Sequence, residues 1–164
     1  MPIGGIVQPP CLDIDDTLRL RAYDGVFEFA YDWYQDIESL KLIDGRDNAV
    51  PYTRERLEKM YTILNGRGEL YFIEKKTGGE YVPVGDVTFW RDDMPIVIAG
   101  PCRNQGIGKK VIRCLIQRAK ELGYRQIHVK EIFEYNTASR RLFEGCGFKK
   151  EDSTENGAGY SLDL

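Results

Sequence analysis

A short apolar strand that runs through a glycine turn into a long helix is the feature that most restricts the fold of this chain. Residues 96–99 read Ile-Val-Ile-Ala, and Gly106 and Gly108 precede a helical pattern that extends to Leu122. The next β-rich run, residues 125–132, begins only after this helix. A connection of that length can link parallel strands. The order therefore predicts a parallel pair at 96–99 and 125–132.

Periodicity along the rest of the chain predicts a mixed α/β domain with a mostly antiparallel sheet and flanking helices. Residues 1–16, rich in Pro, Gly and Asp, are expected to form a loosely ordered arm of one domain that spans 1–164. The other expected elements are a strand at 17–21, a helical stripe over 26–40, a helix over 57–64, strands at 69–75 and 81–90, a helix over 136–146, and a hairpin of 148–150 with 160–163.

Composition excludes several classes of function. The formal net charge of −3 gives no electrostatic footprint for bulk nucleic-acid binding. No apolar run approaches the roughly 18 residues of a membrane helix, and the first ten residues lack the pattern of a signal peptide. The four cysteines form no C-x-x-C pair, and His128 is the single histidine, so we expect no zinc site. A cytoplasmic protein with reduced thiols and no metal is expected.

The glycine turn has the chemistry of an anion site. Helix N-termini present unpaired N–H groups, and glycines let an anion approach that backbone closely. Arg103, Lys109 and Lys110 add positive charge there. A P-loop is excluded because Arg103 stands where its first glycine should be, and Lys110 where its hydroxyl residue should be. Val111 likewise replaces the third glycine of a dinucleotide fingerprint. The turn therefore predicts a different phosphate or pyrophosphate site.

Two sequence motifs, in the order in which one protein family carries them, indicate that family. The segment Arg103-Asn-Gln-Gly106-Ile-Gly108 resembles the Gln/Arg-x-x-Gly-x-Gly/Ala signature of the GNAT acetyltransferases. Residues 136–148 resemble that family's second signature, Asn-x-x-Ser-x-x-x-(Tyr/Leu)-Glu-x-x-Gly-Phe. The resemblance is clearest over 84–150, and the N-terminal half is similar to ribosomal-protein and aminoglycoside acetyltransferases.

The resemblance implies acetyl-CoA as the acetyl donor. Backbone N–H groups of the turn would hold its pyrophosphate, and the strand at 97–99 would pair with its pantetheine amides and supply the oxyanion donor. The resemblance also implies that this strand splays from its parallel neighbour at 125–132 to admit the thioester. Asn136 would bind the pantetheine arm, or would only cap the last helix. The cofactor-binding residues that the resemblance implies are Val97, Ile98, Ala99, Arg103, Asn104, Gln105, Gly106, Ile107, Gly108, Lys109, Asn136, Ser139, Arg140 and Phe143.

The catalytic groups are less well defined. The position of the base in histone-type relatives corresponds to Asp92, and its position in ribosomal N-terminal relatives corresponds to Asp93. The alternative interpretation is that both are turn aspartates before Met94-Pro95. Many relatives carry a tyrosine acid where this chain has Phe143, so Tyr135 or Ser139 would have to substitute, or no acid is used. Weaker candidates for the base are Asp86, Glu131 and Glu134.

The resemblance also implies a primary amine as the acceptor, attacking acetyl-CoA directly in a ternary complex. Negative charge on the first helical region would favour an aminoglycoside, a polyamine or a peptide N-terminus. The alternative is that these acids, Asp36, Glu38, Asp44 and Asp47, only face water. A non-catalytic acyl-CoA sensor is the alternative function. Dimers are frequent in such folds, so a second copy of the chain is a candidate partner.

Overall fold

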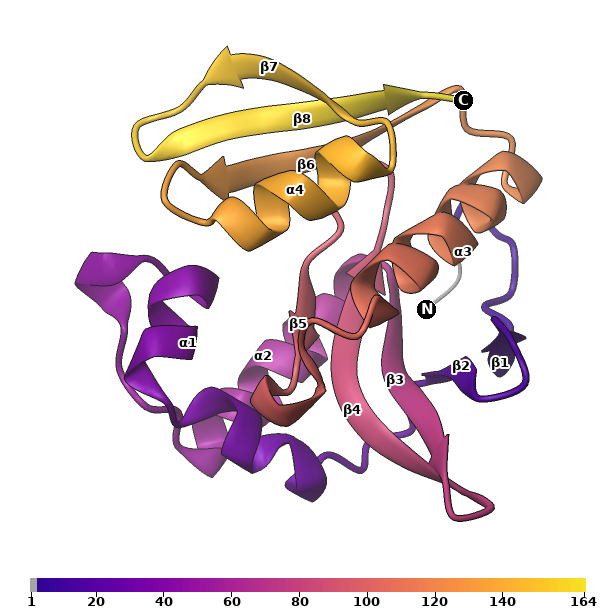
Figure 1. Cartoon of the computed structure of the whole chain (residues 1–164). Helices are drawn as coiled ribbons and strands as arrows, with labels where there is room; N and C mark the ends of the chain where they lie inside the picture. The colour runs from indigo at the N-terminus through magenta and orange to yellow at the C-terminus, as the bar shows by residue number, and fades with distance from the viewer. Residues whose placement is uncertain (1–2) are drawn as a thin grey trace.

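The computed structural model describes residues 3–164, which form two antiparallel sheets flanked by helices (Figure 1). The larger sheet has the strand order β1-β2-β3-β4-β5, and the smaller has the order β6-β8-β7. The mixed α/β class is therefore confirmed. The strands are β1 (Cys11–Asp13), β2 (Leu18–Ala22), β3 (Glu69–Thr77), β4 (Glu80–Phe89), β5 (Ile96–Ile98), β6 (Gln126–Phe133), β7 (Lys149–Ser153) and β8 (Gly157–Asp163).

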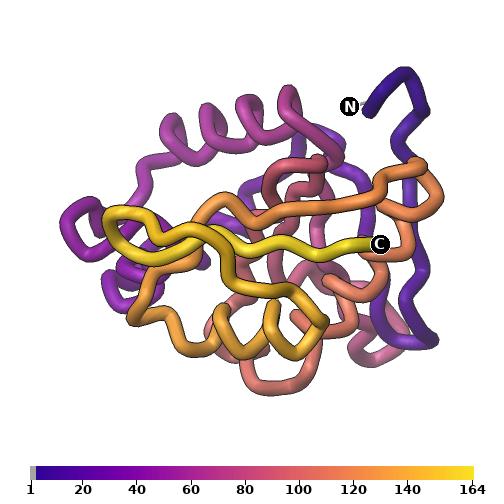
Figure 2. Tube along the Cα trace, turned by 90° about the horizontal axis from the view of Figure 1, so that it is seen from above, coloured from indigo at the N-terminus to yellow at the C-terminus, as the bar shows by residue number. Residues whose placement is uncertain are grey.

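Helices cover both faces of the larger sheet. α3 packs its apolar stripe on one face, and α2 packs with η1 on the other (Figure 1). Figure 2 shows α2 and α4 on opposite sides of the molecule. β3 is consequently buried from Glu69 to Glu74, since both of its faces are covered. The helices are η1 (Glu28–Tyr34), α1 (Ile37–Ile43), η2 (Arg46–Asn48), α2 (Arg54–Arg67), η3 (Gly100–Cys102), α3 (Ile107–Glu121) and α4 (Thr137–Gly145). No helix in residues 3–164 is long and apolar enough to cross a membrane.

The two sheets meet at one end and separate at the other. His128 donates its N–H to Arg91 O at 2.9 Å, and Lys130 donates its N–H to Asp93 Oδ1 at 3.1 Å. These contacts advance along both segments in the same direction, as in parallel pairing. Beyond them no ladder joins β5 to β6 within residues 3–164. The expected splay is therefore wide enough to divide the sheet in two.

The N-terminal region differs from the expectation in two places. Part of the expected arm, Cys11–Asp13, forms β1 and pairs with β2, while residues 1–2 lie outside the described residues. The helical stripe over 26–40 divides into η1 and α1 because Asp36 caps a new helix. Its carboxylate accepts from Ser39 N at 3.1 Å and from Ser39 Oγ at 2.8 Å. The amphipathic spacing of apolar residues continues through this break, so the sequence pattern alone does not reveal where one helix ends and the next begins.

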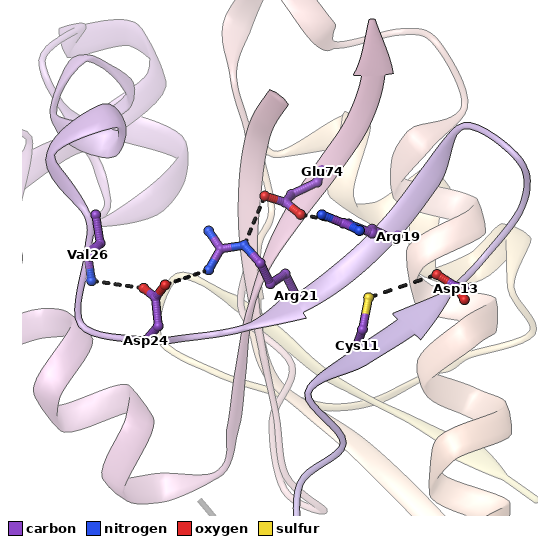
Figure 3. Close-up of polar contacts among 7 residues, drawn as sticks. All are labelled: Cys11, Asp13, Arg19, Arg21, Asp24, Val26 and Glu74. Carbon is purple, nitrogen blue, oxygen red and sulfur yellow. Dashed lines mark hydrogen bonds and ion pairs between the residues drawn. The ribbon is translucent and has the colours of Figure 1, made fainter. Parts of the chain in front are cut away.

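A charged cluster fixes the loop that enters η1 (Figure 3). Buried Glu74 on β3 accepts from Arg19 Nε at 2.8 Å and from Arg21 Nε at 2.9 Å. Arg21 also binds Asp24, whose second carboxylate oxygen accepts the N–H of Val26. The two arginines satisfy the carboxylate that β3 buries. The cluster thereby ties β2 and β3 to the chain that leads to η1.

A second buried carboxylate lies between β4 and the helices. Asp86 is 3% exposed, and its Oδ2 accepts from the hydroxyls of Tyr34 at 2.6 Å and Tyr61 at 2.7 Å. Burial raises the pKa of Asp86 from 3.8 to about 6, even though both hydroxyl hydrogen bonds favour the carboxylate. Folding therefore favours the protonated acid, and this contribution to stability is lost as pH rises from about 4 through about 6.

Asp86→Asn is expected to remove that pH dependence. The amide oxygen can still accept from both tyrosines but carries no charge. The free energy of unfolding of the variant, relative to the wild type, should increase by up to about 3 kcal/mol between pH 4 and pH 7.5. Urea denaturation at the two pH values measures this change. A difference between the proteins that is the same at both values would contradict it.

Candidate active site

A cavity of about 720 Å³ opens where β5 and β6 separate, and we call it the cleft. α1, the start of α3, and α4 complete its walls. This volume is in the range of small-molecule sites. Twelve of the sequence-predicted site residues line the cleft: Asp93, Val97, Ile98, Arg103, Asn104, Gly106, Ile107, Gly108, Glu131, Asn136, Ser139 and Phe143.

The N-terminus of α3 opens into one end of the cleft. Asn104 (φ 62°) and Gly106 (φ 77°) both adopt left-handed backbone, which turns the chain sharply from β5 into the helix. Gly106 is the N-cap residue and provides no side-chain cap. The first N–H groups of α3 are therefore open to an anion, and the helix dipole favours one there.

The edge of β5 that does not pair with β4 lines the cleft, from the glycine turn at one end of the cleft to the opposite end. Ala99 N donates to Val84 O at 2.8 Å, and Thr88 N donates to Pro95 O at 3.0 Å. Backbone groups alternate along an antiparallel strand, so those of Val97 also face β4. Those of Ile96 and Ile98 face the cleft. The sequence-based interpretation assigned this role to Val97, Ile98 and Ala99, and only Ile98 has the required orientation.

Arg103 connects the turn to α1 across the cleft. Its Nε donates to Ile98 O at 3.0 Å, and its Nη2 donates to Ser39 Oγ at 3.2 Å. The Ser39 hydroxyl in turn donates to the cap residue Asp36. Arg103 therefore positions α1 against the strand edge, a role that its place in the sequence motif does not indicate.

Asp93 is the carboxylate at the β4–β5 end of the cleft. Its Oδ1 accepts from Met94 N at 2.9 Å and from Lys130 N at 3.1 Å, and its Oδ2 takes neither hydrogen bond. Burial raises the pKa of Asp93 above its ordinary value, although these N–H groups act in the opposite direction. Such a carboxylate is a stronger base than an ordinary aspartate. Asp92 instead pairs with Arg91 at 3.1 Å on the surface and does not line the cleft.

α4 forms the remaining wall. Asn136 accepts the N–H of Ser139 at 3.1 Å, which confirms it as the cap of this helix. Phe143 is buried against Phe148, with ring centroids 5.2 Å apart, and brings no hydroxyl to the cleft. The position at which the family resemblance implied a tyrosine acid is therefore occupied by a buried ring without a hydroxyl.

The other predicted residues lie outside the cleft lining. The Tyr135 hydroxyl donates to Lys41 O at 2.6 Å, so Tyr135 holds α1 and is not placed to act as the acid. Arg140 pairs with Glu134 at 3.3 Å, and Gln105 accepts from Lys75 at 2.9 Å. Residues that the sequence did not indicate complete the lining, among them Ser39, Leu42, Ile96, Ile132 and Phe133.

Solved structures with this fold include several acetyltransferases. A GNAT-family acetyltransferase from Bacillus anthracis matches with a TM-score of 0.75 and 17% identity over 90% of this chain and 95% of its own. The ribosomal-protein α-N-acetyltransferase RimL, in complex with coenzyme A, matches with 0.74 and 16% over 94% and 98%. Spermidine N-acetyltransferase from Vibrio cholerae, with CoA and spermine, matches with 0.69 and 20% over 91% and 96%. At these identities the similarity establishes the fold.

The family itself follows from a sequence-model comparison. Residues 27–148 match the model described as the acetyltransferase (GNAT) family, which covers more than half of the chain and includes both signature segments. No curated protein sequence gives a significant match. The expected family and acetyltransferase class are confirmed: this chain belongs to the GNAT acetyltransferase family.

Proposed function

We propose that this protein transfers an acetyl group from acetyl-CoA to a primary amine. One observation carries the proposal: a single cleft joins an uncapped helix N-terminus, a strand edge whose Ile96 and Ile98 N–H groups face away from β4, and a partly buried carboxylate. This order matches a ligand with a diphosphate, an amide-containing arm and a reactive end. The similar RimL and spermidine acetyltransferase structures contain coenzyme A, which supports this choice of donor.

The chain's own groups fit such a donor. N–H groups at the start of α3, from Gly106 to Gly108, would hold the diphosphate. The Ile98 N–H would donate to an amide carbonyl of the arm, as one strand pairs with another, while the Ile98 carbonyl accepts from Arg103 Nε. When bound, acetyl-CoA supplies an activated acetyl thioester.

Two groups near the other end of the strand would assist the transfer. Asp93 accepts the proton that the attacking amine loses, directly or through water. The Ile96 N–H, which faces the cleft at this end of β5, donates to the oxygen on which negative charge develops. Phe143 cannot protonate a leaving thiolate, so the thiolate takes its proton from solvent.

Mass spectrometry of reactions with acetyl-CoA and a panel of amines tests this function. The expected result is an acetylated amine together with one equivalent of CoA. Acetyl-CoA binding without any acetylated product would favour the alternative, a non-catalytic acyl-CoA sensor. Absence of both binding and product would contradict the proposal.

Gly106→Asp is expected to weaken acetyl-CoA binding at least about tenfold relative to Gly106→Asn. Asn and Asp tolerate left-handed backbone similarly, and a Cβ at Gly106 meets no atom within 4 Å. Only the aspartate adds negative charge beside the expected diphosphate. Gly108 is a poorer test site, since a Cβ there would lie 3.2 Å from Leu142 Cδ2. Calorimetric titration of both variants measures the ratio, and equal affinities would refute the turn assignment.

A further inference from the structure

The charges near the cleft do not match a polycationic acceptor. The sequence indicated acidic residues in the first helical region, but none of them lines the cleft. Asp36 caps α1, Glu38 pairs with Lys41 at 2.8 Å, and Asp44 accepts from the Tyr52 hydroxyl at 3.0 Å. Asp47, on η2, is exposed and outside the lining. The acids therefore do not provide a negatively charged acceptor site.

The ionised side chains that do line the cleft are balanced. Asp93 and Glu131 are its carboxylates, and Arg103 and Lys130 are its cations. Of the carboxylates, Asp93 is partly buried and Glu131 is exposed. An acceptor with several ammonium groups would leave all but one without a buried partner, which is unfavourable. An acceptor with one amine, placed beside Asp93, matches the ionised side chains that line the cleft.

Apolar side chains line the cleft on either side of the split. Leu42 and Ile43 come from α1, and Ile132 and Phe133 come from β6. The two walls approach each other at the end of α1, where a Cβ on Gly45 would lie 3.4 Å from the Phe133 ring. These side chains can bury an apolar group that is attached to the reacting amine.

We infer that the acceptor carries one amine next to an apolar group, as in a peptide whose first residue has a large apolar side chain. This inference rests on the proposed function and names its substrate class. The amine lies at Asp93 and the apolar group lies between Leu42 and Phe133. Polyamines and aminoglycosides are poorer acceptors because, among residues 3–164, the cleft lining offers no further buried carboxylate.

The test compares kcat/KM for acetyl-CoA with tetrapeptides that differ only in a first Leu, Gly or Lys, and with spermidine. The wild type should use the Leu peptide at least tenfold better than the Gly peptide, the Lys peptide or spermidine. Leu42 lines the cleft and is part-exposed, so it can be changed with little effect on folding. Leu42→Asp should abolish the preference for Leu over Gly, whereas Leu42→Met should retain it.

The outcomes separate the two claims. Turnover that is equal across the peptides, or fastest with spermidine, overturns the acceptor class and leaves acetyl transfer established. A Leu preference that persists in Leu42→Asp overturns the assignment to this wall. No product with any amine, despite acetyl-CoA binding, overturns the proposed function and the acceptor class with it.

Discussion

Asp93→Asn is expected to lower the rate of acetyl transfer about 100- to 1000-fold. The amide oxygen can still accept the N–H groups of Met94 and Lys130, so the local fold should be retained. What is lost is the group that accepts the amine's proton. Steady-state kinetics with an accepted amine measures the effect. Asp92→Asn is the matched control, and because Asp92 is paired on the surface it should change the rate less than about twofold.

The pH dependence adds a second readout for Asp93. A general base works only when deprotonated, so the wild-type rate should fall as pH decreases through the pKa of Asp93. Since burial raises this pKa, the fall should begin above the ordinary range of an aspartate. Asp93→Asn should lack that limb. If the limb persists in the variant, or if Asp92→Asn reproduces the loss, the base is a different group.

Arg118→Met is expected to destabilise the fold by about 3–5 kcal/mol. Arg118 binds Glu69 through Nη2–Oε2 at 2.7 Å and Nε–Oε1 at 3.0 Å, and Glu69 is fully buried. Without the guanidinium, the buried carboxylate keeps only the Tyr71 hydroxyl, which donates at 2.8 Å. An unpaired buried charge is far more costly than a lost surface ion pair.

Urea denaturation monitored by circular dichroism measures this loss. The double variant Glu69→Gln/Arg118→Met is the control, since it removes both charges and should be more stable than Arg118→Met alone. A loss below about 1 kcal/mol for the single variant, or a double variant that is less stable than it, would show that the pair does not join α3 to β3 as described.

Local signals in the sequence were sufficient for the parts of the site that are built from neighbouring residues. The strand, the glycine turn and the amphipathic α3 follow one another directly, so their chemistry can be read in order. Asn136 similarly carries its own capping signal, and its bond to Ser139 N is within one helical turn.

The features that depend on direction or on distant partners could not be predicted. The edge of β5 that pairs with β4 decides whether the backbone groups of Ile96 or those of Val97 face the cleft. The alternation of residues along the strand does not reveal which edge pairs. Asp92 and Asp93 are adjacent in a turn, yet only Asp93 points into the cleft. The Tyr135 hydroxyl is bound by Lys41 O, 94 residues away in sequence. Each outcome depends on tertiary contacts.

Hydrogen exchange of backbone amides with and without acetyl-CoA tests the central claim most directly. The Ile98 N–H and the first N–H groups of α3 face the cleft and should gain protection when acetyl-CoA binds. We expect protection to be concentrated in peptides spanning residues 96–109, with weaker protection at the start of α4. Acetyl-CoA binding that leaves residues 96–109 unchanged would contradict it.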